Sequence, residues 1–198
     1  MEIPDSKQSG ILLETKMKLA LSGISGSGKD YLVKHLIENH QFTRVSFSDQ
    51  LKKLAKSIYP WMEQDYPEFE KERPLNVVTS RGEKITLTPR QIWLKLNCLR
   101  DIEDGLFIRM LEEEMVLKNS DNIVISDIRT KHEFNWCVKN GFTTIYINPT
   151  KYIYERNSFD NQIMEFQEFT DFEFVNNFDG LKGFEKFIQY IQESSNEP

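Results

Sequence analysis

Residues 23–30 read GISGSGKD, and they stand between an apolar run at 18–22 and a segment from Tyr31 onward whose apolar residues keep helical spacing. Glycines let backbone N–H groups wrap around an anion, a helix N-terminus points at the same anion, and one lysine reaches the outer phosphates. This order of strand, glycine-rich loop and helix predicts a phosphate-binding loop, with Lys29 at the β- and γ-phosphates of a nucleoside triphosphate. The residues that we assign to this loop are Gly23, Ser25, Gly26, Ser27, Gly28, Lys29 and Asp30.

The last residue of the stretch is unusual, because Ser or Thr commonly stands where this chain has Asp30. The hydroxyl of that Ser or Thr helps to hold the magnesium ion of the nucleotide. Two interpretations follow from the difference. Either the loop is a degenerate flexible turn, or it places a carboxylate near the metal.

The length, the net charge and the cysteines of the chain limit its possible domain organisation and ligands. Its 198 residues fit one domain, which we predict at 17–198 behind a flexible segment at 1–16. A net charge of −6 disfavours binding to nucleic acid or to an anionic membrane. We expect a cytoplasmic protein, since the sequence shows no signal peptide and no apolar run near the length of a membrane span. Cys98 and Cys137 lack the spacing of metal ligands and are predicted to be core residues.

Strands alternate with helices along the chain, which predicts an α/β fold with a mostly parallel sheet of about five strands and helices on both faces. The predicted strands are 17–22, 44–47, 122–127, 142–148 and 172–175, and the predicted helices are 31–40, 50–58, 90–100, 103–118, 131–140 and 181–191. Irregular sequence at 61–88 predicts an insertion with a short hairpin, and the polar and aromatic stretch at 150–169 predicts a small lid.

Asp127 follows a buried strand, at the edge of the sheet where α/β proteins bind their ligands. In phosphate-loop enzymes an acid at this place orients Mg²⁺ or its water shell, and Asp30 with Asp127 would supply the carboxylates that Mg²⁺ prefers. The alternative is that Asp127 caps the helix that begins after Thr130. Arg129, on the same loop, is predicted to clamp phosphate oxygens, its alternative being a solvated surface arginine.

Three further charged residues stand at places where a phosphate-transferring site needs them. Asp49 and Lys52 begin the helix after the second strand, again at the carboxyl end of the sheet, where Ser48 or Asp49 would also serve as the helix cap. Arg156 is the one arginine of the predicted lid, and a lid arginine supplies charge to a transferring phosphoryl group. Its alternative is a plain surface arginine. The aromatic residues Phe159, Phe166, Phe169, Phe172, Phe174 and Phe178 are predicted to be core rather than a platform for a base.

Taken together, these motifs resemble the deoxynucleoside monophosphate kinases of bacteriophages. The shared runs are GISGSGKD at 23–30, FSDQLK at 47–52, TPR at 88–90, LRD at 99–101 and ISDIR at 125–129 followed by Glu133, and they match in order and spacing across about 18–177. Glu165 and the segment 172–177 also fit the C-terminal end of that family. An aspartate after the loop lysine is usual in it, so Asp30 becomes a diagnostic residue.

The resemblance implies a three-layer, adenylate-kinase-like P-loop kinase fold and transfer of the γ-phosphoryl group of ATP to a deoxynucleoside 5′-monophosphate, with Mg²⁺. It implies that Lys29 and the loop amides hold the donor phosphates and that Asp127 serves the metal. The residues that it places toward the acceptor are Asp49, Lys52, Arg90, Trp93, Arg100 and Arg129. The chain departs from the family at Asn97 and Cys98, where relatives carry a Gly-Thr pair.

Two other functions fit part of the pattern. Phosphomevalonate kinases of the animal type share the Gly-Lys-Asp ending, a Leu-Lys pair and a Ser-Asp-x-Arg run, but they favour an arginine-rich loop and lack the Thr-Pro-Arg helix start. A lid with one arginine also suits a nucleotide-binding module that has lost catalysis. Exposed aromatic residues in the insertion would give the protein a homodimer face, and a viral chain would work in the host cytoplasm.

Overall fold

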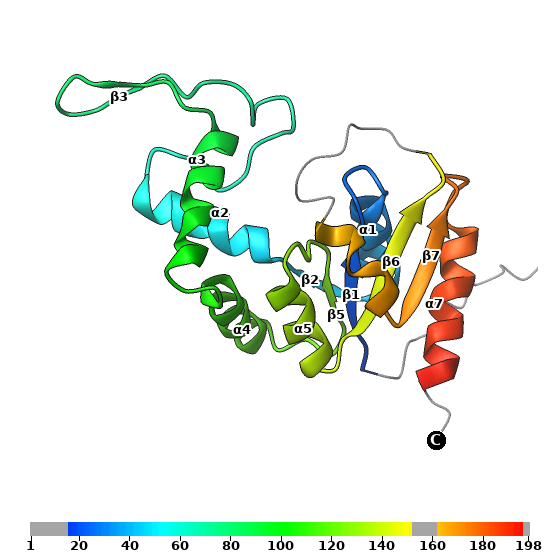
Figure 1. Ribbon diagram of the computed structural model, residues 1–198. Helices are drawn as coiled ribbons and strands as arrows, with labels where there is room; N and C mark the ends of the chain where they lie inside the picture. Colours follow the sequence, from blue (N-terminus) through cyan, green and yellow to red (C-terminus); the bar gives the residue numbers. More distant parts are fainter. Residues whose placement is uncertain (1–15, 152–161, 196–198) are drawn as a thin grey trace, which may run out of the picture. The chain divides into compact units, whose positions relative to one another are not determined.

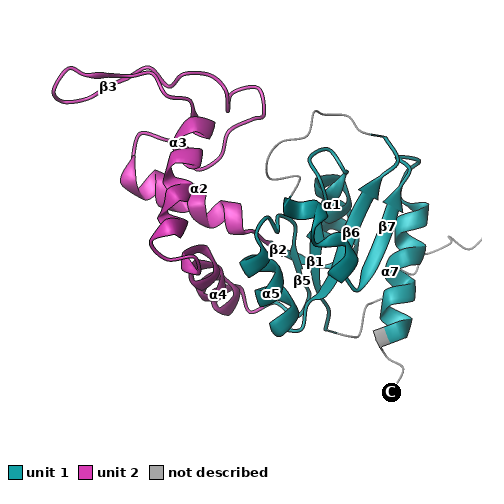
Figure 2. Ribbon diagram, in the orientation of Figure 1, with its two compact units in different colours: residues 1–44, 120–198 teal, residues 45–119 magenta. Residues whose placement is uncertain are grey.

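The computed structural model describes residues 16–151 and 162–195, and in it the chain divides into two compact units (Figure 2). We call Met1–Arg44 with Ser120–Pro198 the sheet unit, and Val45–Asn119 the helical unit. The insertion predicted at 61–88 lies wholly inside the helical unit. The flexible segment at 1–16 falls almost entirely outside the described residues, and one domain over 17–198 stays a prediction.

A five-stranded sheet with the order β2-β5-β1-β6-β7 forms the centre of the sheet unit (Figure 1). The pairs β1–β5, β1–β6 and β6–β7 are parallel, with Ala20 opposite both Ile125 and Thr144. The strands are β1 Lys18–Ser22, β2 Thr43–Val45, β5 Ile123–Ile125, β6 Thr143–Pro149 and β7 Phe172–Asn176. This confirms the predicted mostly parallel α/β sheet.

Helices cover both faces of this sheet. The three long ones are α1 Lys29–His40, α5 Lys131–Lys139 and α7 Lys182–Ser195. Side chains alternate between the faces of a strand, and Leu19 and Leu21 of β1 join one buried cluster with Leu36 of α1 and Phe184 of α7. Helices α1 and α7 therefore share one face. Figure 1 shows α5 in front of the sheet and α1 behind it, as the predicted three layers require.

The helical unit holds three helices, two of which, α2 and α3, contribute to a smaller apolar cluster. These helices are α2 Phe47–Ile58, α3 Pro89–Leu96 and α4 Leu106–Lys118, and a 3₁₀ segment η1 at Asn97–Asp101 separates α3 from α4. Ala55, Met62, Ile92 and Trp93 are the buried members of the cluster. The predicted hairpin is present as antiparallel strands β3 Val77–Val78 and β4 Lys84–Ile85.

The ends of two helices differ from the prediction. Helix α2 begins at Phe47, because Ser46 caps it by accepting a 3.2 Å hydrogen bond from the backbone N–H of Asp49. Neither Ser48 nor Asp49 is the cap. The helix predicted at 90–100 ends at Leu96 and continues as 3₁₀ turns, so that Cys98 is exposed and its prediction as a core residue is wrong. Cys137 is buried as predicted.

Much of the predicted lid, including Arg156 and Phe159, lies outside the described residues. Its described end holds the 3₁₀ segment η2 Gln167–Phe169. Phe166 is buried there and stacks on Phe134 with ring centroids 5.3 Å apart, which fits its prediction as core. Phe169 is 65% exposed, so its prediction as core is wrong. Within 16–151 and 162–195, no helix has both the length and the apolar character that crossing a membrane requires.

Candidate functional site

The loop that joins β1 to α1 requires glycine at two positions. Gly23 and Gly28 have φ of 143° and 89°, a region that side chains disfavour. A Cβ on Gly23 would lie 2.6 Å from the backbone oxygen of Ile147, and one on Gly28 would lie 2.3 Å from Nδ2 of Asn176. Both distances are too short for any side chain. The glycines of the GISGSGKD stretch therefore allow the loop to close tightly against β6 and β7.

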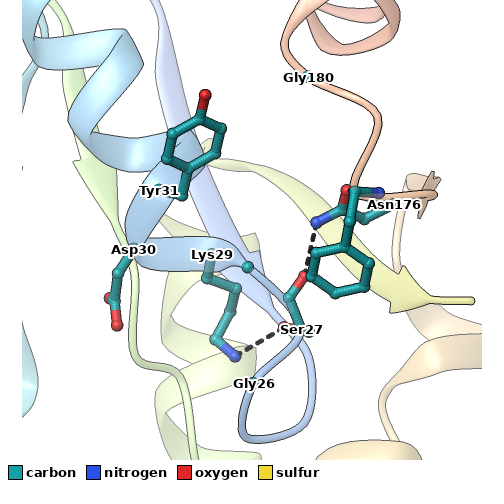
Figure 3. A pocket seen from close by; sticks show the side chains of 9 residues that line it. Gly26, Ser27, Lys29, Asp30, Tyr31, Asn176 and Gly180 are labelled. Carbon is teal, nitrogen blue, oxygen red and sulfur yellow. Dashed lines mark hydrogen bonds between the residues drawn. The ribbon is translucent and has the colours of Figure 1, made fainter. Parts of the chain in front are cut away.

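Lys29 folds back over this loop. Its Nζ donates hydrogen bonds to the backbone oxygens of Gly23 and Ile24, at 2.6 and 2.8 Å, and to Oγ of Ser27 at 3.0 Å, the last of which Figure 3 shows. A cation at a helix N-terminus is opposed by the helix dipole, and these three acceptors offset that cost. The ammonium group is thus held inside the curve of the loop, where a bound anion would supply stronger acceptors.

A pocket of about 550 Å³ opens beside the loop (Figure 3). It is lined by Gly26, Ser27, Gly28, Lys29, Asp30, Tyr31, Asn176, Phe178 and Gly180. Asp30 and Tyr31 are exposed on the first turn of α1. Phe178 is 40% exposed, so its prediction as a core residue is wrong. It instead forms part of the pocket wall, with φ at 57°.

Asn176, at the end of β7, is a site residue that the sequence did not reveal. It is buried, its Nδ2 donates a 2.9 Å hydrogen bond to the backbone oxygen of Ser27, and its Oδ1 accepts one of 3.0 Å from the N–H of Phe178. One side chain thereby joins the phosphate loop to the turn that follows β7. The sequence signal was limited to the predicted strand at 172–175 and the family likeness of 172–177, since the register that places Asn176 opposite Pro149 is a property of the folded sheet.

Asp127 and Arg129 follow β5, the strand beside β1. Because β5 and β1 run parallel, with Ile125 opposite Ala20, the segment after β5 leaves the sheet at the same edge as the loop of Lys29. Asp127 is half-buried and Arg129 is exposed. The structure therefore brings the predicted metal-binding acids and Arg129 to one edge of the sheet unit.

A buried glutamate fixes the backbone around these two residues. Glu133 is fully buried, and its Oε2 accepts hydrogen bonds of 2.8 and 3.0 Å from the N–H groups of Arg129 and Thr130. Thr130 caps α5 through Oγ1, which accepts a hydrogen bond from the N–H of Glu133. The alternative role of Asp127 as the cap of this helix is therefore wrong. Burial, together with the charges of Glu133 and Asp127, raises the pKa of the Cys137 thiol far above its usual range. The thiol therefore stays protonated and unreactive.

Three of the predicted acceptor-side residues meet within the helical unit. Nζ of Lys52 lies 3.4 Å from Oδ1 of Asp49, 3.2 Å from Oδ1 of Asp65 and 5.6 Å from the ring centroid of Trp93. The Lys52 side chain is 16% exposed, so these groups hold the cation close to the apolar cluster. Nε1 of Trp93 is buried and has no hydrogen-bond partner in the part of the chain that the structure describes.

The two arginines of the predicted acceptor side make different contacts. Arg90, at the start of α3, forms ion pairs with Glu72 and with Glu68, the latter at 2.6 Å. Arg100, in η1, donates a 2.9 Å hydrogen bond from Nε to Oδ1 of Asn97, and its guanidinium group lies 4.8 Å from the ring centroid of Phe107. A straight helix would separate these arginines by about 15 Å. The end of α3 at Leu96 removes that constraint.

No protein-family model matches the chain, and no curated protein matches it. Solved structures do match. TT1252 from Thermus thermophilus has a TM-score of 0.52 and 13% identity, over 93% of this chain and 100% of that one. Dephospho-CoA kinase from Campylobacter jejuni has a TM-score of 0.55 and 15% identity, over 89% of this chain and 98% of that one. At these identities the likeness concerns the fold alone, and it confirms the predicted P-loop kinase fold without reaching the narrower bacteriophage family.

Proposed function

We propose that this chain is an ATP- and Mg²⁺-dependent kinase that phosphorylates a deoxynucleoside 5′-monophosphate to the diphosphate. The observation that carries the proposal is the position of Lys29, whose Nζ lies within 3.0 Å of three oxygen atoms of a glycine-rich loop at the N-terminus of α1. This is the arrangement that a triphosphate exploits. The acceptor class rests on the motif resemblance, in which Asp30 is the diagnostic residue.

On the donor side, the loop amides and Lys29 would bind the phosphates of ATP. Lys29 would exchange the backbone oxygens of Gly23 and Ile24 for phosphate oxygens, which are stronger acceptors because they are charged. Asp30, exposed on the first turn of α1, and Asp127, half-buried after β5, offer carboxylate oxygens of the kind that Mg²⁺ prefers. When bound, Mg²⁺ would neutralise charge on the phosphates.

On the acceptor side, the helical unit offers cations and one buried donor. Lys52 and Arg100 would bind the phosphate of the acceptor, and Arg90 would do so by releasing Glu68 and Glu72. The N–H of Trp93 has no hydrogen-bond partner among the described residues, and a bound acceptor would satisfy it. Arg129, which follows β5, would neutralise charge on the phosphate of the acceptor. Arg156, outside the described residues, is proposed as the lid arginine.

Phosphoryl transfer asks the protein for positioning and charge neutralisation, with little covalent chemistry. No nucleophilic side chain is therefore needed. The proposed machinery consists of Lys29 and the loop amides on the donor, Asp30 and Asp127 toward Mg²⁺, and the cations named above on the acceptor.

An acceptor screen tests the proposal. ADP release from ATP and Mg²⁺ is measured with each common deoxynucleoside monophosphate, each ribonucleoside monophosphate, dephospho-CoA and phosphomevalonate. We expect the highest kcat/KM with a deoxynucleoside monophosphate, and loss of turnover in Lys29→Ala. ATP binding without ADP release for any acceptor would instead indicate a nucleotide-binding module.

A second candidate keeps the kinase and changes its acceptor. The fold likeness to dephospho-CoA kinase from Campylobacter jejuni, over 89% of this chain, favours that acceptor as the alternative. The same screen separates the two acceptors, because a dephospho-CoA kinase would release ADP with dephospho-CoA and would release none with the deoxynucleoside monophosphates.

A further inference from the structure

Two histidines and a glutamate meet between α1 and α7, away from the phosphate loop. His35 and His40 stand on α1 and Glu185 stands on α7, and one ligand atom from each lies within 4.8 Å of the others. Nε2 of His35 contacts Oε1 of Glu185, and Nε2 of His40 lies 3.0 Å from Oε2 of the same carboxylate. The proposed kinase function uses none of these three residues.

His40 lies beside Glu185 without making a well-aligned hydrogen bond. Both of its ring nitrogens are buried, and neither has a hydrogen-bond partner within 16–151 and 162–195. Nε2 lies close to the carboxylate of Glu185, but the direction of approach is not that of an N–H···O hydrogen bond. A metal ion lies along the lone pair of a ligating nitrogen, with the other ligands to the side of that direction. The placement of Glu185 beside Nε2 suits such a geometry.

The donor set selects a class of metal. Two imidazole nitrogens and one carboxylate oxygen suit Zn²⁺ and neighbouring transition metals, whereas Mg²⁺ prefers oxygen ligands alone. His35 is 9% exposed and the Glu185 side chain is 41% exposed, so the cluster is buried on the α1 side and open to water on the α7 side. Water can therefore supply the fourth ligand of a tetrahedral site.

Asn39 lies where the orienting partner of a metal-bound histidine belongs. Its Nδ2 is 2.9 Å from Nδ1 of His35 and 3.2 Å from the backbone oxygen of His35. Half a turn of the amide would bring the Asn39 oxygen to Nδ1, where it accepts from Nδ1–H, and would give up the bond to the backbone oxygen of His35. Nε2 of His35 would then keep its lone pair for the metal.

We propose that His35, His40 and Glu185 form a structural site for a transition-metal ion of the zinc class. His35 and His40 stand 6 and 11 residues after Lys29, or about 9 and 16 Å along the axis of α1, so the site is separate from the phosphate loop. A bound ion would cross-link α1 to α7 over the core cluster that both helices cover. The site does not depend on the proposed kinase function.

The test uses the full chain without a histidine tag, stripped of metal with a chelator and then dialysed. Zn²⁺ is titrated by calorimetry and Co²⁺ by visible absorption, with thermal unfolding followed in parallel. We expect one equivalent of each ion to bind, and a rise in Tm of about 5–10 °C at a hundredfold excess of Zn²⁺ over its Kd. Mg²⁺ without nucleotide is expected to leave Tm unchanged.

Four variants test the ligands. His40→Ala and Glu185→Gln should abolish the Tm rise, while His132→Ala, which removes the exposed third histidine of the chain, should keep it. His40→Cys replaces one zinc ligand by another and should keep Zn²⁺ binding, with a sulfur-to-cobalt band in the Co²⁺ spectrum. The Tm of each chelated variant shows whether it folds.

Three results would overturn the site. They are an absence of stoichiometric binding to the wild-type chain, equal binding by His40→Ala, and loss of binding in His132→Ala. The first would leave the cluster as an ion-pair network between Glu185 and the two histidines. Because the measurements use neither ATP nor an acceptor, their failure is distinguishable from a failure of the kinase proposal.

Discussion

Lys29 stands at the N-terminus of α1, where the helix dipole disfavours a cation. The three hydrogen bonds from its Nζ to the loop offset that cost. The residue is therefore held at a position that stability alone does not favour, which is the expected mark of a functional side chain.

Replacing Lys29 by alanine separates function from fold. We expect Lys29→Ala to lower kcat by ~10²–10³-fold or more, because it removes a donor from the transferring phosphates. The free energy of unfolding should change by no more than about 1 kcal/mol. Loss of the hydrogen bonds destabilises the fold, whereas removal of the unfavourable interaction between the cation and the helix dipole stabilises it. Steady-state kinetics and urea unfolding measure the two effects.

Lys34→Ala is the matched control for this substitution. Lys34 is exposed on the same helix and forms a 3.7 Å ion pair with Glu38. Its loss should leave kcat unchanged. Near-normal turnover in Lys29→Ala would contradict the assignment of the phosphate loop.

Asn176 supports the loop from a strand 149 residues away along the chain. Asn176→Ala would leave the backbone oxygen of Ser27 without this donor, and we expect it to lower the free energy of unfolding by about 1–3 kcal/mol. KM for ATP should rise several-fold, because the loop would lose its fixed position. Asn177→Ala, at the exposed neighbouring position, is the control. An unchanged KM for ATP in Asn176→Ala would show that this contact does not shape the donor site.

At the scale of elements, local signals predicted more than long-range ones. The Thr-Pro start of α3 and the end of α5 just before Gly141, which has φ of 71°, follow local signals, because caps act within a few residues. The start of α2 was misplaced since Ser46, Ser48 and Asp49 are all good caps, and the buried Phe47 decides among them by packing. Asn176 was missed for a related reason, because only the pairing of β6 with β7 places it at the loop.

A half-buried carboxylate joins α2 to α4 in the helical unit. Burial alone would raise the pKa of Glu114, but hydrogen bonds from Lys118, Lys53 and Gln50 outweigh it and lower the pKa to about 2. A folded-state pKa below the unfolded value stabilises the protein above the unfolded pKa. This contribution is complete above about pH 5 and is lost as the pH falls toward 2.

Glu114→Gln should therefore destabilise the protein in a pH-dependent manner. We expect a loss of about 1–2 kcal/mol at pH 7, since water screens part of the interaction, and almost none near pH 2. Urea unfolding across this pH range, with the exposed Glu113→Gln on the same helix as reference, measures the difference. A loss that stays constant with pH would mean that Glu114 acts through packing instead of charge.

At the scale of the whole molecule, the order of strands and helices predicted the layers but not the two units. Alternating β and α segments imply a covered parallel sheet, and that is a property of the chain order. The boundary at Val45 and Asn119 depends on which side chains pack together, for example Trp93 with Met62, and no local pattern marks it. Consequently the donor residues fall in the sheet unit and most of the proposed acceptor residues fall in the helical unit.

This division predicts that the two substrates protect different parts of the molecule from hydrogen exchange. A non-hydrolysable ATP analogue with Mg²⁺ should slow exchange at 23–30 and around Asn176, because ligands raise the free energy of local opening where they bind. A deoxynucleoside monophosphate alone should slow exchange in the helical unit at 47–52 and 88–101. Lys29→Ala should lose the first pattern and keep the second. Protection by the monophosphate confined to the sheet unit would contradict the assignment of Lys52, Arg90 and Arg100 to the acceptor, while leaving the donor site intact.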